Sequence, residues 1–353
     1  MKFFIKTFGC QYNEWDSARL SFVLKKSGFE ETIEKEDADV VFVLNCSVRK
    51  TGVDRALGFA ENAKKRDQKI IVAGCVLKND KVRFQAKGAD FWDCTSTDEL
   101  KKILGDQIDL KEINALFGKS QAASNYIPIT KGCNNFCSYC AVPYTRGREI
   151  SRPVEEIISN VKKVVVAGYN EFWLLGQNVN SYRGELDNDQ KIGFSELLKL
   201  VNEIPGDFLI NFTSSHPKDM TEEIIRAVAD LPKVKKIIHL PLQSGSNKIL
   251  KAMNRPYTIE QYLALIAKIK NIIPNIRLTT DTIVGFPGED ENDFTETEHI
   301  LKEVEYYQVY NNKYSPREGT DAFQLGDPVP WAEKERRWRI LNNISNKSRD
   351  KSK

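Results

Sequence analysis

Apolar and polar positions alternate along the first hundred residues in a way that predicts an α/β fold. Short apolar runs are separated by longer stretches whose apolar residues recur with the period of a helix. The short runs predict strands, and strand and helix in alternation indicate a parallel sheet with helical crossovers. The expected strands are 2–8, 40–44, 70–73 and 91–92, and the expected helices are 14–26, 50–65 and 97–104.

The alternation resumes on a longer scale after residue 125. Six strand-and-helix units follow, which indicates a barrel or an open partial barrel of parallel strands. The expected strands are 126–129, 172–175, 208–212, 236–240, 277–284 and 307–310, and the expected helices are 154–166, 194–203, 221–229, 259–271 and 291–304.

These two halves predict two domains joined by a linker. The small polar run GKSQAASN, within residues 106–125, has no clear period, which is typical of linkers. We expect an open parallel-sheet domain over residues 1–110, a linker over 111–125, a partial (β/α)6 barrel over 126–330 and a basic helix or tail over 331–353.

Composition narrows the class of protein. With 353 residues, of which 41% are hydrophobic and 29% charged, the chain has the profile of a globular protein of about two domains. Seven cysteines, an odd number, exclude a scaffold held wholly by internal disulfides. No apolar run approaches the roughly 18 residues of a transmembrane helix, and the first residues do not resemble a signal peptide. We therefore expect a reduced, cytoplasmic protein with no membrane partner.

Charge is uneven only at the C-terminus. The net charge is +3, yet the 23 residues from Trp331 carry eight lysines or arginines against three acids. Such a stretch is either a solvated helix end or an arm that contacts phosphates.

Three cysteines occupy the same place relative to successive predicted strands. Cys10, Cys46 and Cys75, here called the N-terminal cysteines, each stand just after a strand. Because the carboxyl ends of parallel strands meet at one edge of a sheet, these cysteines can converge there. Three at equivalent positions favour a metal site over three structural thiols. Cys94 follows the fourth predicted strand and is expected to be a bystander, with a fourth ligand as the alternative.

The other three cysteines form a compact motif. Cys133, Cys137 and Cys140, here called the loop cysteines, have the spacing C-x3-C-x2-C after the first strand of the second half. Structural zinc needs four ligands and typically uses paired C-x2-C knuckles, whereas three thiolates on one short loop suit an iron–sulfur cube with one open iron.

The loop motif, with Tyr139 before its last cysteine, resembles the radical S-adenosylmethionine (SAM) superfamily. Further motifs resemble, in order, those of the methylthiotransferases, and LLGQNVNSY followed by SSHP is most similar to the tRNA-modifying MiaB type. The resemblance covers about residues 1–340. Its motifs are GCQYNEWDS, NCSVR, GCNNFCSYCAVPYTRGREISRP, LLGQNVNSY, SSHPKDM, HLPLQSGS, TTDTIVGFPGE and YSPREGT.

This resemblance implies a reaction and its cofactors. It implies one 4Fe–4S cluster on the loop cysteines, where SAM binds, and an auxiliary 4Fe–4S cluster on the N-terminal cysteines. In the family, one SAM methylates a sulfur on the auxiliary cluster, and a second yields a radical that opens the substrate. The implied substrate is carbon 2 of N6-dimethylallyladenosine next to the tRNA anticodon, whose C–H bond is too weakly acidic for a side-chain base. The implied partners are the tRNA anticodon loop, an electron donor such as a flavodoxin or ferredoxin, and a sulfur donor.

Residues at the ends of the barrel strands are the expected SAM contacts, because such folds bind ligands there. A turn or capping role is the alternative for each of these residues. For Ser214 and Ser244, which also lie at strand ends, that alternative is as well supported as a SAM contact. The residues assigned to SAM are Tyr139, Gly176, Gln177, Asn178, Thr213, Ser215, Gln243 and Gly285.

Three arginines that follow the loop cysteines are candidates for RNA binding. Arg146, Arg148 and Arg152 can clamp phosphates of an anticodon loop, whose single-stranded bases are open to recognition. Their alternative is pairing with nearby glutamates.

The histidines are weak candidates for catalysis. His216 and His239 lie beside prolines at strand ends, and radical chemistry needs no histidine base, so no residue is assigned as acid or base. His299 is expected on the surface of a helix.

Two features depart from the family pattern. Relatives carry a small C-terminal β-barrel module that binds RNA, for which this chain has no room, and Glu318 in YSPREGT stands where relatives have proline. Two other functions therefore stay open. The first is a methylthiotransferase whose target is threonylcarbamoyl-modified tRNA or a ribosomal protein. The second is an iron–sulfur RNA-binding or assembly protein without turnover.

Overall fold

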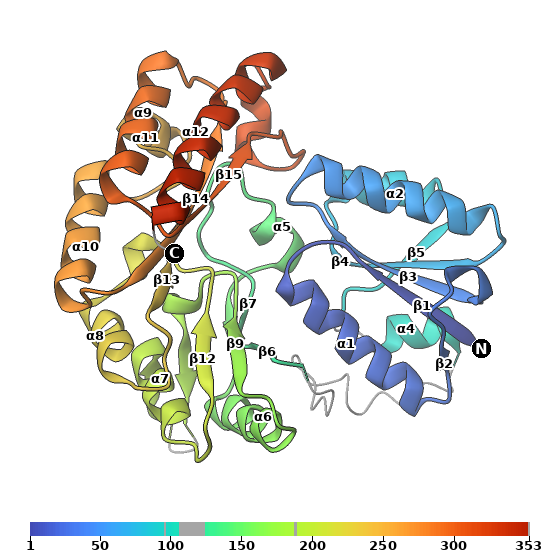
Figure 1. Ribbon diagram of the computed structural model, residues 1–353. Coiled ribbons are helices and arrows are strands. Elements are labelled where there is room, and N and C mark those ends of the chain that lie inside the picture. Colours follow the sequence, from blue (N-terminus) through green and yellow to red (C-terminus); the bar gives the residue numbers. More distant parts are fainter. Residues whose placement is uncertain (95–96, 106–123, 187–188, 352–353) are drawn as a thin grey trace.

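Two parallel sheets organise the chain, one in each half (Figure 1). The computed structural model describes residues 1–94, 97–105, 124–186 and 189–351. Most of the predicted linker lies outside the described residues. The α/β class predicted from the alternating pattern is confirmed.

The first sheet has the strand order β2-β1-β3-β4-β5, and all its strands are parallel. Alternate residues of its central strand point to opposite faces, because side chains alternate along a strand. Phe42 and Leu44 join the apolar cluster under one pair of helices, whereas Val41 and Val43 join the cluster under the other pair. The strands are β1 Lys2–Thr7, β2 Glu30–Glu31, β3 Val40–Cys46, β4 Lys69–Cys75 and β5 Ala89–Phe91.

Helices cover both faces of this sheet. The first pair is α1 Gln11–Lys26 and α4 Thr97–Leu104, and the second is α2 Lys50–Lys64 and α3 Lys78–Gln85. The sequence did not predict α3, because only Asp80 and Phe84 of its eight residues are buried and its apolar period is weak. A sheet covered on both faces leaves the ends of its strands as the place for a site.

The second sheet is the predicted partial barrel of six parallel strands. Its hydrogen-bonded ladders are β12-β9-β6 and β13-β14-β15, and a single bridge from Ile210 to Val234 joins them. The ladder breaks there because β13 is only three residues long. The strands are β6 Tyr126–Pro128, β9 Glu171–Leu175, β12 Leu209–Phe212, β13 Ile237–His239, β14 Arg277–Val284 and β15 Gln308–Lys313.

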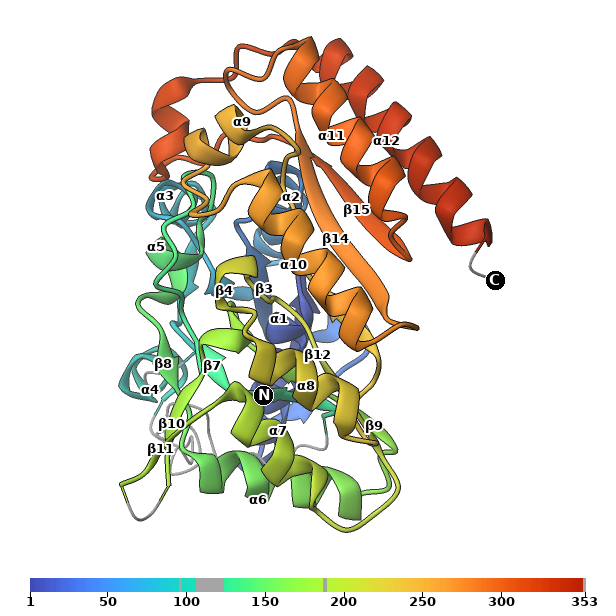
Figure 2. The same cartoon turned by 90° about the vertical axis from the view of Figure 1, so that its left-hand side faces the viewer.

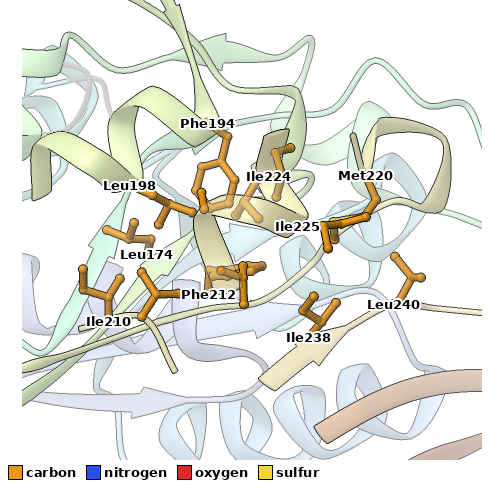
Figure 3. Packing of buried hydrophobic residues seen from close by; sticks show 14 of the residues in the cluster. Leu174, Phe194, Leu198, Ile210, Phe212, Met220, Ile224, Ile225, Ile238 and Leu240 are labelled. Carbon is orange, nitrogen blue, oxygen red and sulfur yellow. The ribbon is translucent and has the colours of Figure 1, made fainter. Parts of the chain in front are cut away.

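Amphipathic helices pack around the outside of the barrel. Side chains such as Leu174, Phe212 and Ile238 meet the apolar faces of these helices in one continuous core (Figure 3). Local signals fix the helix ends: Thr258 and Gln261 form a capping box at the start of α10. The helices are α6 Val154–Val166, α7 Phe194–Asn202, α8 Glu222–Asp230, α10 Ile259–Ile272 and α11 Glu291–Val304.

Several short elements fall below the length at which a periodic pattern can be recognised. They include two antiparallel strand pairs, two short helices and four 3-10 turns. These elements are β7 Thr130–Lys131 with β8 Ile150–Ser151, β10 Arg183–Glu185 with β11 Lys191–Gly193, α5 Val142–Arg146, α9 Asn247–Ala252, η1 Lys35–Asp37, η2 Val179–Ser181, η3 Pro217–Asp219 and η4 Asp321–Leu325.

The basic C-terminal stretch forms a helix, α12 Trp331–Lys351, that packs against β15 and α11 (Figure 2). Leu341 on this helix is fully buried. Basic side chains in the described first half of this helix pair with acids, as Arg337 does with Glu289 at 2.7 Å and Arg339 with Glu335 at 2.9 Å. In that half, these pairs give no support to a free phosphate-binding arm. None of the helices in the described ranges is long and apolar enough to cross a bilayer.

Leu174→Ala tests the barrel core. Leu174 lies on the central strand of its ladder and is fully buried, so the substitution should lower the free energy of unfolding by about 2–5 kcal/mol. Leu209→Ala on the neighbouring strand is the control, because Leu209 is 40% exposed and its loss should cost about 0.5 kcal/mol or less. Urea denaturation followed by circular dichroism measures both values, and equal losses would contradict this core.

Candidate active site between two groups of cysteines

The N-terminal cysteines lie at the carboxyl edge of the first sheet. Cys46 and Cys75 end β3 and β4 and stand opposite one another in the parallel pair. Cys10 precedes α1 in the turn after β1. Gly9, at a φ of 125°, packs so closely on Cys46 that a Cβ atom on it would lie 2.6 Å from the Cys46 Cβ. The fold thus brings the three cysteine-bearing loops together.

Burial and the charge of neighbouring cysteines raise the pKa of Cys10 and of Cys46. Burial, together with the charges of Cys75 and Cys10, raises the pKa of Cys46 to about 12. A metal group must therefore displace protons when it binds here. Among the residues that the structure describes, no three His, Cys, Asp or Glu side chains converge as the ligands of one metal ion do. Cysteine thiolates are the ligands that iron–sulfur clusters use, so the residues at this edge have the donor chemistry of such a site.

Arg146 reaches the N-terminal cysteines from the second half of the chain. Its Nε–H donates to Cys75 Sγ at 3.0 Å, and its NH2 group pairs with Asp16 at 3.1 Å. The Arg146 side chain is only 5% exposed. A phosphate contact therefore has no support at this position, because the guanidinium is buried and already paired.

The loop cysteines lie on the segment between the short strands β7 and β8. The antiparallel pair β7–β8 closes the base of this segment, where Thr130 stands opposite Ser151. Gly132 has a φ of 80°, and a Cβ atom there would lie 2.2 Å from the backbone oxygen of Arg148. Its N–H donates to Gln177 Oε1 at 2.6 Å. Tight backbone packing thus fixes how the loop cysteines are presented.

A second buried arginine faces the loop cysteines. Arg255 donates to Cys137 Sγ at 3.3 Å and to the carbonyl oxygen of Pro241 at 3.2 Å. The loop also docks on this segment through Ser138, whose backbone N–H donates to the Met253 oxygen. A positively charged guanidinium beside a cysteine suits a site that holds a negatively charged iron–sulfur group. Sequence reasoning missed Arg255, because the 118 residues that separate it from Cys137 give no spacing signal.

Unpartnered polar atoms gather near the loop cysteines at the ends of the barrel strands. In the described part of the chain, seven buried side chains keep an oxygen or nitrogen without a hydrogen-bond partner, and four of them follow the first three barrel strands. Buried polar groups are normally paired, so the atoms of these four mark a place that fits a polar ligand. They are Thr130 Oγ1, Asn178 Oδ1, Ser215 Oγ and His216 Nε2.

Other residues assigned to SAM have structural tasks that explain them. Gln177 accepts the Gly132 N–H, as described above. A Cβ atom on Gly176 would lie 2.2 Å from Thr130 Oγ1, so glycine is needed for packing. Gly285 has a φ of 71° and faces the side chain of Lys334, which favours the turn-forming alternative at that position. Ser244 accepts from the Ser246 N–H at 3.2 Å, in a local capping role.

A cavity of about 690 Å³ has residues close in sequence to both groups of cysteines in its wall. One part of the wall is formed by residues 48–51, which begin two residues after Cys46, and another by Tyr139, Cys140 and Ala141. Its volume falls in the range of small-molecule sites. Barrel residues complete the lining: Gln243, Asp281, Ile283, Asn311, Asn312, Lys313, Tyr314, Ser315, Pro316, Asp327, Trp331 and Trp338.

Comparison with known proteins agrees with this arrangement. Residues 127–301 match the Radical SAM superfamily, and residues 2–92 match a family described as Uncharacterized protein family UPF0004. The chain is 42% identical to the tRNA-2-methylthio-N(6)-dimethylallyladenosine synthase of Clostridium botulinum strain Hall, over 98% of its own length and 82% of that relative. The chain belongs to this family of radical SAM enzymes. The synthase of Thermotoga petrophila is 40% identical over 98% of the chain and 81% of the relative.

Solved structures show the same fold. The radical SAM methyltransferase TsrM from Kitasatospora setae superposes with a TM-score of 0.59 over 91% of this chain and 77% of that one, at 11% identity. The cobalamin-dependent SAM radical enzyme OxsB gives a TM-score of 0.58 over 97% of this chain and 56% of that one. Membership of the radical SAM family means that the chain uses SAM and a 4Fe–4S cluster.

The three histidines have different surroundings in the structure. Burial and the charges of Arg255 and Lys218 lower the pKa of His216 to about 2, so its ring is a poor proton acceptor. His239 is held between Thr279 and Asp281, at 2.9 Å from each. His299 is largely exposed on α11, as predicted.

The remaining arginine candidates divide in two. Arg152 is 1% exposed and pairs with Glu156 at 3.1 Å. At this position the structure therefore has the alternative expected from the sequence, which is pairing with a glutamate. Arg148 is exposed, and its guanidinium stacks over the Phe136 ring at 4.4 Å. It alone among the three keeps a geometry open to RNA.

Cys94 belongs to the apolar cluster under α1, and its surroundings are mainly apolar. It is 4% exposed, and its carbonyl oxygen accepts from Arg19. Burial raises the pKa of its thiol to about 12. A structural role for Cys94 remains our prediction.

Gly132→Ala tests the geometry of the cysteine loop. The new Cβ atom would collide with the Arg148 backbone, so the variant should lose most of its cleavage of SAM to 5′-deoxyadenosine after anaerobic reconstitution. Gly168→Ala is the matched control, since Gly168 has a similar φ of 85° but a Cβ atom there meets nothing within 4 Å. The control should pay only the backbone penalty of about 1–2 kcal/mol and keep its activity. Equal activity in the two variants would show that the loop is not tightly packed.

Proposed function

We propose that the chain is a tRNA methylthiotransferase that adds a methylthio group to carbon 2 of N6-dimethylallyladenosine next to the anticodon. The observation that carries this proposal is a cavity whose wall includes a loop cysteine and the segment that follows Cys46. Cys140 lines it on one side, and the residues that follow Cys46 line it on the other. A base in this cavity would lie between the place where a radical is generated and the place where sulfur is held.

The cysteines divide between two cofactor sites in this proposal. The loop cysteines hold the SAM-binding 4Fe–4S cluster, and the N-terminal cysteines hold an auxiliary 4Fe–4S cluster. When bound, these groups supply a radical that abstracts hydrogen and a sulfur for transfer, which side chains alone do not provide. Arg146 and Arg255, each donating to a thiol, balance the charge of the two sites. Asn178 and Ser215, with their unpartnered atoms, are the best-supported SAM contacts, and Tyr139, Thr213 and Gln243 are assigned with them.

The lining of the cavity favours a prenylated adenine. Ile283, Pro316 and Trp338 present apolar surface that suits a dimethylallyl group better than the polar threonylcarbamoyl group. Aromatic side chains are also the usual platform for an unstacked base. At the rim, Arg49 and Lys50 are exposed and can meet RNA phosphates together with Arg148.

Further components follow from the chemistry. Reductive cleavage of SAM consumes an electron, which a flavodoxin or ferredoxin would deliver, and each turnover consumes a sulfur atom from a sulfur donor. Arg49, Lys50 and Arg148 are basic and exposed, which supports the anticodon loop of tRNA as the macromolecular partner.

Deleting the gene tests the substrate. The 2-methylthio derivative of N6-dimethylallyladenosine should disappear from total tRNA nucleosides, with the unmodified prenylated nucleoside accumulating in its place. Liquid chromatography with mass spectrometry measures both. Complementation with the wild-type gene should restore the product and complementation with Cys133→Ala should not. Unchanged 2-methylthio content in the deletion strain would refute the tRNA assignment.

Cysteine variants test the two sites separately. Cys133→Ala should abolish 5′-deoxyadenosine formation, because it removes a ligand of the SAM-binding cluster. Cys10→Ala should keep 5′-deoxyadenosine formation and lose the methylthio product, with about half of the reconstituted iron. Cys94→Ala is the matched control and should behave as wild type in both assays. A Cys10→Ala variant that makes the methylthio product at the wild-type rate would remove the auxiliary site from the account.

A further inference from the structure

Arg146 is the side chain that joins the two groups of cysteines. It ends α5, six residues after Cys140, yet its Nε–H donates to Cys75 Sγ at 3.0 Å in the other domain. The helix itself contacts β4, the strand that ends in Cys75. Arg146, which follows the loop cysteines, thus contacts the thiol of Cys75 in the proposed auxiliary site.

The surroundings of Arg146 hold its guanidinium in one orientation. The NH2 group donates to Asn13 Oδ1 at 2.7 Å and to Asp16 Oδ2 at 3.1 Å. The plane of the guanidinium lies over the Tyr12 ring at 4.1 Å. Because Asp16 and Tyr12 lie on α1, the contact with Cys75 is set by a fixed frame rather than by a free side chain.

Asn13 extends this frame to the other N-terminal cysteines. Its Nδ2 group donates to the carbonyl oxygens of Phe8 and Asn45, both at 2.8 Å. Phe8 stands two residues before Cys10, and Asn45 immediately precedes Cys46. The frame around Arg146 therefore reaches all three cysteine-bearing loops.

A docking role alone does not account for the contact with sulfur. A second arginine, Arg317, crosses between the domains and pairs with Asp80 at 2.6 Å, with side chains 6% and 7% exposed. This pair is as buried as Arg146 and Asp16, but no contact between Arg317 and a cysteine sulfur is found in the described structure. Domain docking thus has its own ion pair, and the donation from Arg146 to Cys75 needs a separate explanation.

We propose that Arg146 is a positioning residue with two effects. It orients the N-terminal cysteines relative to the loop cysteines, and it stabilises the reduced state of the auxiliary cluster on the N-terminal cysteines. This inference rests on the proposed auxiliary cluster. Hydrogen bonds to cluster sulfurs and nearby charge are the levers by which a protein sets a cluster's reduction potential. A positive donor on a ligand sulfur favours the state that carries one more electron, so its loss should move the potential to more negative values.

The test uses full-length protein carrying Cys133→Ala, so that the auxiliary cluster alone gives a signal. Midpoint potentials are measured by redox titration with electron paramagnetic resonance, and iron is counted per chain. Arg146→Gln should retain iron and show a more negative potential. Arg146→Lys, which keeps the charge without the planar fork, should show a smaller shift. Arg317→Gln, the matched control, should leave the potential unchanged.

Activity supplies the second readout, in protein that retains Cys133. Arg146→Gln should reduce the methylthio product about 10- to 100-fold, as substitutions around metal ligands typically do, while 5′-deoxyadenosine formation stays within about twofold of wild type. Arg317→Gln should keep the ratio of the two products.

Two results would overturn the inference. An Arg146→Gln variant with the wild-type potential, or the same potential shift in Arg146→Gln and Arg317→Gln, would reduce Arg146 to a docking residue. A Cys133→Ala protein that binds no iron would instead refute the auxiliary cluster of the proposed function, and this inference with it.

Discussion

Parallel strands end on a common edge, and both halves of this chain place cysteines beyond that edge. In the first sheet, β3 and β4 lie in register up to their last residues, so Cys46 and Cys75 become neighbours without any local motif. In the barrel, the loop cysteines follow the first strands, and Cys140 lines the same cavity as residues beyond β13 and β15. Helices cover both faces of the first sheet, which leaves the strand ends as the place where two sites can face one another.

Buried charge at the domain interface holds these two ends at a fixed separation. The first domain supplies Asp16 and Asp80, and the barrel supplies Arg146 and Arg317. Buried ion pairs contribute little net stability, because desolvation offsets their attraction, but breaking one leaves a costly unpaired charge. Apolar contacts around Leu175 supply the burial between the domains. We infer that the ion pairs select one relative orientation of the domains, which a reaction shared between two sites requires.

The sequence predicted the regular elements well where period and end signals agree. The bounds of α6, α11 and β14 match the prediction, and α11 begins at a capping box formed by Asp290 and Asp293. Short elements such as β7, β8 and α5 were missed, because two to five residues are too few to show a helical or alternating pattern of apolar residues. The C-terminal stretch was expected to be a solvated helix end or a phosphate-contacting arm, yet Arg336 and Arg337 in its described half pair with Glu291 and Glu289, which are distant in sequence.

The sequence placed the cysteines at or after strand ends, where the structure has them, but it did not show which way the neighbouring side chains point. The cysteines follow strands, so topology placed them, whereas three arginines on one short segment face different ways. Arg146 points into the other domain, Arg152 into the barrel and Arg148 outward, and spacing alone does not encode those directions. Asn13 stood within a quoted motif, GCQYNEWDS, so its position was visible although its partners were not.

The central claim is that the target adenine binds in the cavity between the two groups of cysteines. Photo-crosslinking of an anticodon stem–loop, carrying a photoreactive group on carbon 2 of the prenylated adenine, tests this most directly. The account predicts crosslinks, mapped by mass spectrometry, to residues 48–51 and 311–316, which form opposite parts of the cavity wall. Crosslinks confined to the outer helices of the barrel, such as α8 and α10, would contradict it.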